Sequence, residues 1–149
     1  MDDQNPQPNQ DATSDEEEYE PYFRHSASLR VFGPKVDLES ITETLGVEPT
    51  HSHRKGEPKK RAKTVWSHDM WLYTVDVNRE KPLGEHLDAL WEVVRPHLDY
   101  LKDLKNAATV DVFLGYRSDC DHAGVVVPHT SLTILTELEV PLSLSIIVT

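Results

Sequence analysis

The chain has 149 residues, of which 38% are hydrophobic and 28% are charged, and this fits one globular domain with an additional tail. Its formal net charge is −11, and Cys120 is its only cysteine, so no disulfide can form within the chain. No segment approaches the roughly 18 apolar residues that a membrane-spanning helix needs. The first residues are charged and proline-rich, unlike a signal peptide, and we therefore expect a cytoplasmic protein without a membrane partner.

Residues 1–24 form an acidic segment with almost no apolar side chains. They contain eight acidic residues against Arg24, which gives a net charge of −7. Such a segment buries too little apolar surface to offset the entropy lost on ordering, so we predict a disordered acidic tail at 1–24 and a single α+β domain at 25–149. The simplest role for the tail is to increase solubility. The alternative is that it competes with an anionic ligand for a basic loop.

The first half of the domain contains two predicted strands and a short helix. Alternating apolar and polar side chains predict a strand at residues 26–33 and a second strand at residues 66–77. Between them, apolar residues at helical spacing predict a helix at residues 38–45. Asp37 is expected to cap its N-terminus, and Gly46 stands where a C-terminal glycine belongs.

The second half contains a long amphipathic segment followed by shorter elements. Residues 83–105 hold an apolar stripe at helical spacing, and Pro96 predicts a kink or a break because it lacks a backbone donor. The remaining predictions are a strand at 110–114, a short edge strand at 125–127, a helix at 132–138 capped by Thr130 or Ser131, and a final strand at 142–146. Ser143 and Ser145 of the final strand are expected to face solvent or a partner.

This order of elements predicts an α+β fold. Two βαβ units surround a long central helix, and half-polar strands favour a two-layer sandwich with helices on one face of the sheet and the other face open. A ferredoxin-like arrangement is the first choice, and another α+β sheet order is the alternative.

Residues 54–63 concentrate positive charge in an otherwise acidic chain. They contain six basic residues against Glu57, a net charge of +5. Guanidinium and ammonium groups recognise phosphates and carboxylates, and the loop leads into two tryptophans. We predict a non-catalytic binding domain that engages an acidic protein surface or an anionic ligand through its open sheet face and this loop. The predicted contact residues are Arg54, Lys55, Gly56, Lys59, Lys60, Arg61, Trp66 and Trp71.

The basic loop has two other interpretations, nucleic-acid binding and a solvated loop with no ligand. Nucleic-acid binding would use its charge for the phosphates and its tryptophans for stacking. The acidic character of the chain and the absence of a GxxxxGK[ST] motif disfavour nucleic acid as the partner. The simplest interpretation is a solvated loop with no ligand.

The rival hypothesis is a small metal-dependent enzyme. His51 and His53 on one loop and Cys120 and His122 on another have spacings that could converge on zinc. No CxxC pair or HExxH helix accompanies them, so surface histidines are the commoner explanation and no cofactor is expected. Carboxylates stand on both sides of Cys120, and their negative charge disfavours a thiolate, which argues against a nucleophile. A third hypothesis is a structural subunit that self-associates through its sheet edge or its serine-lined face.

Several short motifs occur in a fixed order along the chain. They are LGVEPT at residues 45–50, RKGE at 54–57 and VWS at 65–67, followed by the long amphipathic helix. In this combination the chain resembles the bacterial domain-of-unknown-function family 4279 over about residues 27–148. The resemblance implies a small α+β domain and supplies no activity, cofactor or catalytic residue. Some small bacterial domains of this kind act as immunity proteins, so an immunity-like role is one form of the binding hypothesis.

Overall fold

The computed structural model describes residues 22–122 and 124–149. Of the acidic tail predicted for residues 1–24, residues 1–21 lie outside the described part of the chain. Strand β1 (Phe23–Gly33) includes the last two residues assigned to that tail. Both residues pair with the neighbouring strand, so their backbone belongs to the sheet.

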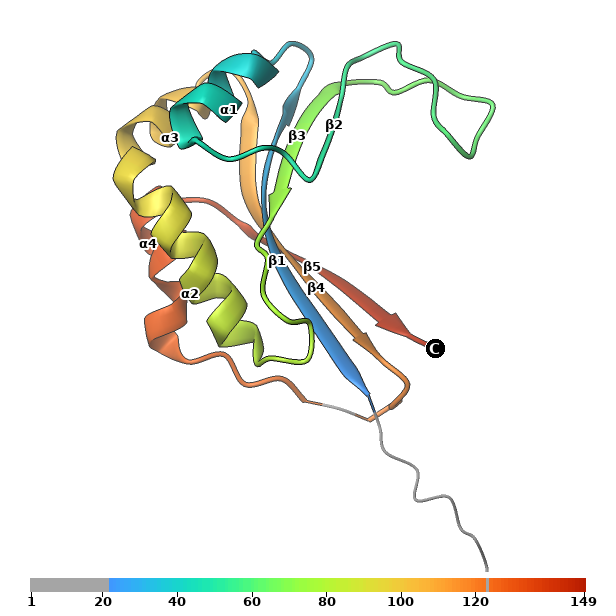
Figure 1. Cartoon of the computed structure of the whole chain (residues 1–149), viewed down its shortest axis with the longest axis vertical. Coiled ribbons are helices and arrows are strands. Elements are labelled where there is room, and N and C mark those ends of the chain that lie inside the picture. The colour runs from blue at the N-terminus through green and yellow to red at the C-terminus, as the bar shows by residue number, and fades with distance from the viewer. Residues whose placement is uncertain (1–21, 123) are drawn as a thin grey trace, which may run out of the picture.

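A five-stranded sheet in the order β2-β3-β1-β4-β5 forms one layer of the molecule (Figure 1). The strands after β1 are β2 (His51–His53), β3 (Asp69–Thr74), β4 (Thr109–Ser118) and β5 (Leu142–Val148). Strands β1 to β4 pair antiparallel, whereas β5 pairs parallel with β4. The ferredoxin-like arrangement is not confirmed, because this fifth, parallel strand makes the sheet mixed.

The helices form the second layer, on one face of the sheet (Figure 1). They are α1 (Leu38–Leu45), α2 (Leu83–Val94), α3 (Leu98–Leu104) and α4 (Thr133–Leu138), with 3-10 turns at Arg95–His97 and His129–Leu132. Ala27, Leu29 and Val31 of β1 are fully buried against this layer, so the core lies between the central strand and the helices. The predicted two-layer α+β sandwich is confirmed.

Helix α1 has the limits that its sequence predicts. The Asp37 carboxylate accepts a hydrogen bond from the backbone N–H of Ser40 at 3.1 Å. At the other end, Gly46 adopts a left-handed conformation with φ of 69°, and its N–H donates to the Thr42 carbonyl at 2.9 Å. Both ends of the helix are therefore satisfied by neighbouring residues in the chain.

The break predicted at Pro96 is confirmed. Helix α2 ends at Val94, a 3-10 turn covers Arg95–His97, and α3 begins at Leu98. The apolar stripe continues through the break, because Val94 and Leu101 are both fully buried. The proline therefore redirects the chain without removing either helix from the core.

Several predicted element limits were wrong. The strand predicted for residues 66–77 is only Asp69–Thr74, and the three residues of β2 were not predicted as a strand. Residues 125–127 form no strand, and Val126 is 87% exposed there. Short strands depend on a partner in space, and that partner is not visible in the local sequence.

Strand β5 exposes its apolar side rather than burying it. Ser143 and Ser145 lie half-buried on the open face, where the Ser143 hydroxyl donates to an Asp111 carboxylate oxygen at 2.8 Å. Leu144 and Ile146 point to the opposite side and are 58% and 65% exposed. The sequence did not predict this exposure, which arises because β5 is the edge strand of the sheet (Figure 1).

Within the part of the chain that the structure describes, no helix has the length and apolar character required to cross a membrane.

Candidate anion-binding hairpin

The basic loop folds as an irregular hairpin that extends the β2–β3 pair beyond the sheet (Figure 1). The Gly56 N–H donates to the Trp66 carbonyl at 2.8 Å, and the Trp66 N–H donates to the Glu57 carbonyl at 2.9 Å. Near the tip, the Lys59 N–H donates to the Thr64 carbonyl at 3.0 Å. Gly56 has a φ of 88°, a conformation that glycine adopts without strain. We call residues 54–66 the basic hairpin.

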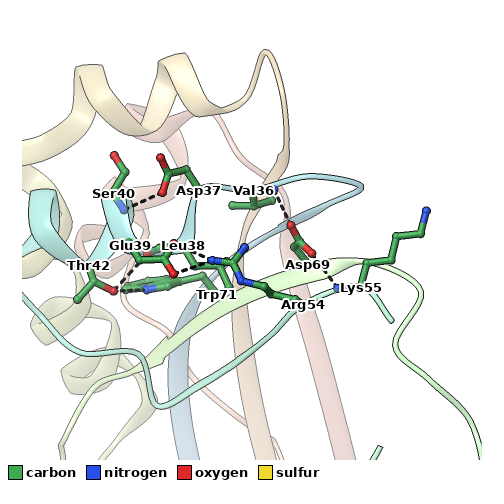
Figure 2. Close-up of polar contacts among 10 residues, drawn as sticks. All are labelled: Val36, Asp37, Leu38, Glu39, Ser40, Thr42, Arg54, Lys55, Asp69 and Trp71. Carbon is green, nitrogen blue, oxygen red and sulfur yellow. Dashed lines mark hydrogen bonds and ion pairs between the residues drawn. The ribbon is translucent and has the colours of Figure 1, made fainter. Parts of the chain in front are cut away.

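Asp69 fixes the base of the basic hairpin to the body of the domain (Figure 2). One carboxylate oxygen accepts from the Lys55 N–H and the other from the Val36 N–H, each at 2.8 Å. These hydrogen bonds hold the pKa of Asp69 below its ordinary value. The hairpin is therefore tied to the segment that precedes α1.

Arg54 forms a bidentate ion pair with Glu39 of α1 (Figure 2). One guanidinium nitrogen donates to both carboxylate oxygens, at 2.6 and 2.7 Å. The pair lowers the pKa of Glu39 and raises that of Arg54. An incoming anion must compete with Glu39 for Arg54. By contrast, the Lys55 side chain points away from Asp69 into the open (Figure 2).

Trp66 lies at the centre of a cluster of rings and one cation. The His53 ring stacks on it, with centroids 3.8 Å apart and an interplanar angle of 7°. Lys59 Nζ lies 4.8 Å from the centroid of the same ring system. Burial lowers the pKa of His53, and the neighbouring His51 and His68 lower it further, which favours neutral His53 at pH 7. His53 already occupies one face of Trp66, so that face is not available for stacking a base.

A hollow of about 440 Å³ lies beside Trp66. Glu57, Lys59, Lys60 and Arg61 supply its charged lining, and His51 and His53 line it as well. Among residues 22–122 and 124–149, no carboxylate forms an ion pair with Lys59, Lys60 or Arg61. The hollow therefore offers three unpaired cations to an anion.

Trp71 belongs to the core, and this corrects its predicted place among the contact residues. Its side chain is 0% exposed, and its Nε1–H donates to the Thr42 hydroxyl of α1 at 3.0 Å. On β3, Trp71 is buried and its two neighbours in the chain are half-buried. Its side chain therefore lies on the side of the sheet that faces the helices. Of the two tryptophans, only Trp66 remains accessible to a partner.

The residues of the rival metal hypothesis do not meet. His51 and His53 lie on β2, and β2 pairs with the end of β3 that adjoins Phe32. Cys120 and His122 follow β4 where it pairs with Phe23, at the opposite end of β1. Within the described ranges, no group of three histidine, cysteine or carboxylate side chains is placed to hold a metal ion.

The comparison with family models identifies the chain. The model for a domain of unknown function, DUF4279, matches residues 21–149. The protein is a member of the DUF4279 family. The match covers the whole described domain, and the resemblance of the motifs at residues 45–67 is thereby confirmed. No curated protein and no solved structure matches this DUF4279 chain.

Sequence analysis gave Glu39 and Asp69 no role beside the basic hairpin of this DUF4279 protein, and it named His53 only as a candidate metal ligand. Glu39 and Asp69 are the only carboxylates that hydrogen-bond with Arg54 and Lys55 in the described chain. Asp69 is the first carboxylate after the basic segment at residues 54–63, and this position is the one signal in the sequence that points to its role. The approach of Glu39 to Arg54 is a tertiary contact with no local signal.

Proposed function

We propose that this DUF4279 protein is a non-catalytic binding domain and that its basic hairpin engages an acidic surface of a partner protein. The observation that carries the proposal is a set of three cations on a projecting hairpin, Lys59, Lys60 and Arg61, that form no ion pair with any described residue. An immunity-like role, in which the domain covers an acidic region of a toxin, is one form of this function.

The arrangement of the charges favours a protein surface over a small ligand in the hairpin hollow. The three cations are consecutive in the chain, Lys60 and Arg61 are exposed, and all three line an open hollow on the projecting hairpin. Long basic side chains spread over an exposed surface accelerate encounter with a negatively charged partner and contribute to specificity. Asp69 and the Arg54–Glu39 pair fix the base of the hairpin, which limits the entropy lost on binding.

Charge reversal at the tip tests the proposal. The variant Lys59→Glu/Lys60→Glu/Arg61→Glu is compared with Lys35→Glu/Lys81→Glu/Lys102→Glu, which has the same change in net charge outside the hairpin. Each protein is immobilised and incubated with lysate of its native host, and the retained proteins are identified and their affinities measured at two salt concentrations.

We expect an acidic protein to bind the unchanged domain and the control, to lose binding to the hairpin variant, and to bind more weakly at high salt. Equal recovery by the hairpin variant, or a bound partner without an acidic surface, contradicts the proposal. Circular dichroism of each variant verifies the fold.

A second candidate function, self-association, is favoured by the exposed apolar side of β5. Its outer edge pairs with no other described strand, and β5 carries no charge that would oppose pairing with a second copy. Two antiparallel copies of β5 would extend the sheet across a twofold axis and cover Leu144 and Ile146. Light scattering over a concentration series should then show a dimer that Leu144→Lys/Ile146→Lys converts to a monomer. A monomeric mass at every concentration excludes this function.

A further inference from the structure

We propose that the domain has a second anion site, at the other end of the open sheet face, in which Arg24, Arg79 and Arg117 bind a phosphate group. This inference is independent of the basic hairpin. Arg24 is nine residues from Gly33 along β1, a separation of roughly 30 Å, and the hairpin lies beyond the Gly33 end.

The sheet register brings two of the arginines together. Arg24 of β1 lies directly opposite Arg117 of β4. Arg79 follows β3, and its carbonyl accepts a hydrogen bond from the His25 N–H at 2.8 Å, which holds its segment beside β1. All three arginines line a single hollow of about 230 Å³.

No carboxylate of residues 22–122 and 124–149 is a partner of the three arginines. Among the described residues, none of them forms an ion pair, although the chain as a whole carries a net charge of −11. On the same face, Arg30 donates two hydrogen bonds to the Asp111 carboxylate, which neutralises its charge. Arg24, Arg79 and Arg117 differ from Arg30 in this respect. Like charges directly opposite each other on neighbouring strands are destabilising. An anion held between Arg24 and Arg117 removes that repulsion.

Gly115 leaves room for the ligand between the arginines and the neighbouring strands. It pairs with Ser26 on one side and with Ser145 on the other, and all three residues line the hollow. A Cβ atom on residue 115 would lie 2.4 Å from the Ser26 hydroxyl oxygen, so a side chain here would require that hydroxyl to move. The hydroxyls of Ser26 and Ser145 make no side-chain hydrogen bond with another described residue and are available as donors.

This set of donors fits a phosphate group better than a single carboxylate. Each guanidinium presents parallel N–H donors that match two oxygens of a phosphate, and phosphate groups carry up to two negative charges. Three cations and two hydroxyls match the charge and the several acceptor oxygens of such a group. The ligand is therefore a phosphate monoester or inorganic phosphate.

Calorimetric titration of the full chain with inorganic phosphate in a low-chloride buffer tests the inference. We expect saturable binding with one phosphate per chain. Arg79→Gln and Arg117→Gln should each weaken it by roughly tenfold, as expected for loss of a charge-assisted hydrogen bond. The control Lys59→Gln/Lys60→Gln should bind phosphate like the unchanged protein. Thermal unfolding verifies that each variant is folded.

Three results would overturn the inference. The first is the absence of phosphate binding by the unchanged protein. The second is binding that Arg79→Gln and Arg117→Gln leave intact. The third is equal affinity for phosphate and acetate, which would assign the site to any anion. The control removes two charges of the basic hairpin and none of the arginine hollow. A negative phosphate titration therefore contradicts only the second anion site, and the proposed function of the basic hairpin keeps its own test.

Discussion

The two ends of the open sheet face both carry positive charge, and they differ in how it is held. At the basic hairpin, three cations that follow one another along the chain line an open hollow on a projecting tip, while Arg54 is paired with Glu39. At the opposite end, three arginines from separate segments line one hollow, and none of them pairs with a carboxylate in the part of the chain that the structure describes. Consecutive basic side chains on a projecting segment suit attraction of a large surface, whereas arginines from separate segments around one hollow suit a compact anion.

The largest expected change in stability concerns the residues that anchor the hairpin end of the sheet. Trp71→Ala removes a fully buried ring that joins β3 to α1, and we expect a loss of about 3 to 5 kcal/mol in the free energy of unfolding. Trp66→Ala should lose only about 1 kcal/mol, because it removes one exposed-side stacking contact with His53. Chemical denaturation measures both values. Similar losses for the two variants would show that Trp66 also belongs to the core.

The next effect depends on the charge of Asp69. Asp69→Asn should cost about 2 kcal/mol of stability at pH 7, since a charged acceptor of two backbone N–H groups is lost. The pKa of Asp69 is lowered in the folded protein, so its contribution is present above the unfolded pKa of about 3.9 and is lost as pH falls through the lower folded value. Denaturation at pH 7 and near pH 3 should show the difference between variant and unchanged protein shrinking. A constant difference contradicts the role of the charge.

At the arginine end, His86 should make stability fall in mild acid. Burial lowers the pKa of His86, so below its ordinary value of about 6.5 the unfolded chain takes up a proton that the folded protein does not. Stability is therefore fully present above pH 6.5 and decreases as pH falls. His86→Gln should flatten this decrease in thermal unfolding measured from pH 7.5 to 5.5. Parallel profiles for the two proteins would remove His86 as a cause.

The smallest expected change in stability distinguishes the arginine hollow from the basic hairpin most directly. Without phosphate and at low salt, Arg117→Gln should stabilise the protein by about 0.2 to 1 kcal/mol, because it relieves the repulsion from Arg24. At saturating phosphate the order should reverse, since only the unchanged protein gains the full stabilisation from its ligand. Thermal unfolding in the two buffers measures this reversal. An unchanged order in both buffers would mean that no phosphate group lies between the arginines.

The sequence predicted those parts of the hairpin and the fold that depend on neighbouring residues. The limits of α1 follow from Asp37 and Gly46, and the break in the long helix follows from Pro96. The concentration of charge at residues 54–63 is likewise local, and these residues do form one projecting hairpin. Each feature needs only a few consecutive residues, so the pattern in the sequence was sufficient.

Features that depend on strand pairing were not predictable in the same way. Trp71 and Trp66 look alike in the sequence, but only Trp71 occupies a position of β3 that faces the helices. The exposure of Leu144 follows from the place of β5 at the sheet edge, and the alternation of its residues does not reveal that place.

The sequence by itself determined an α+β domain of the DUF4279 family with a basic loop, because short-range patterns and motifs carry that information. Only the tertiary structure decided that Arg24 meets Arg117 and that the histidines of β2 are far from Cys120. The physical reason is that register and layer order are set by burial summed over the whole domain. Which charges end up opposite each other is therefore fixed only when the sheet forms.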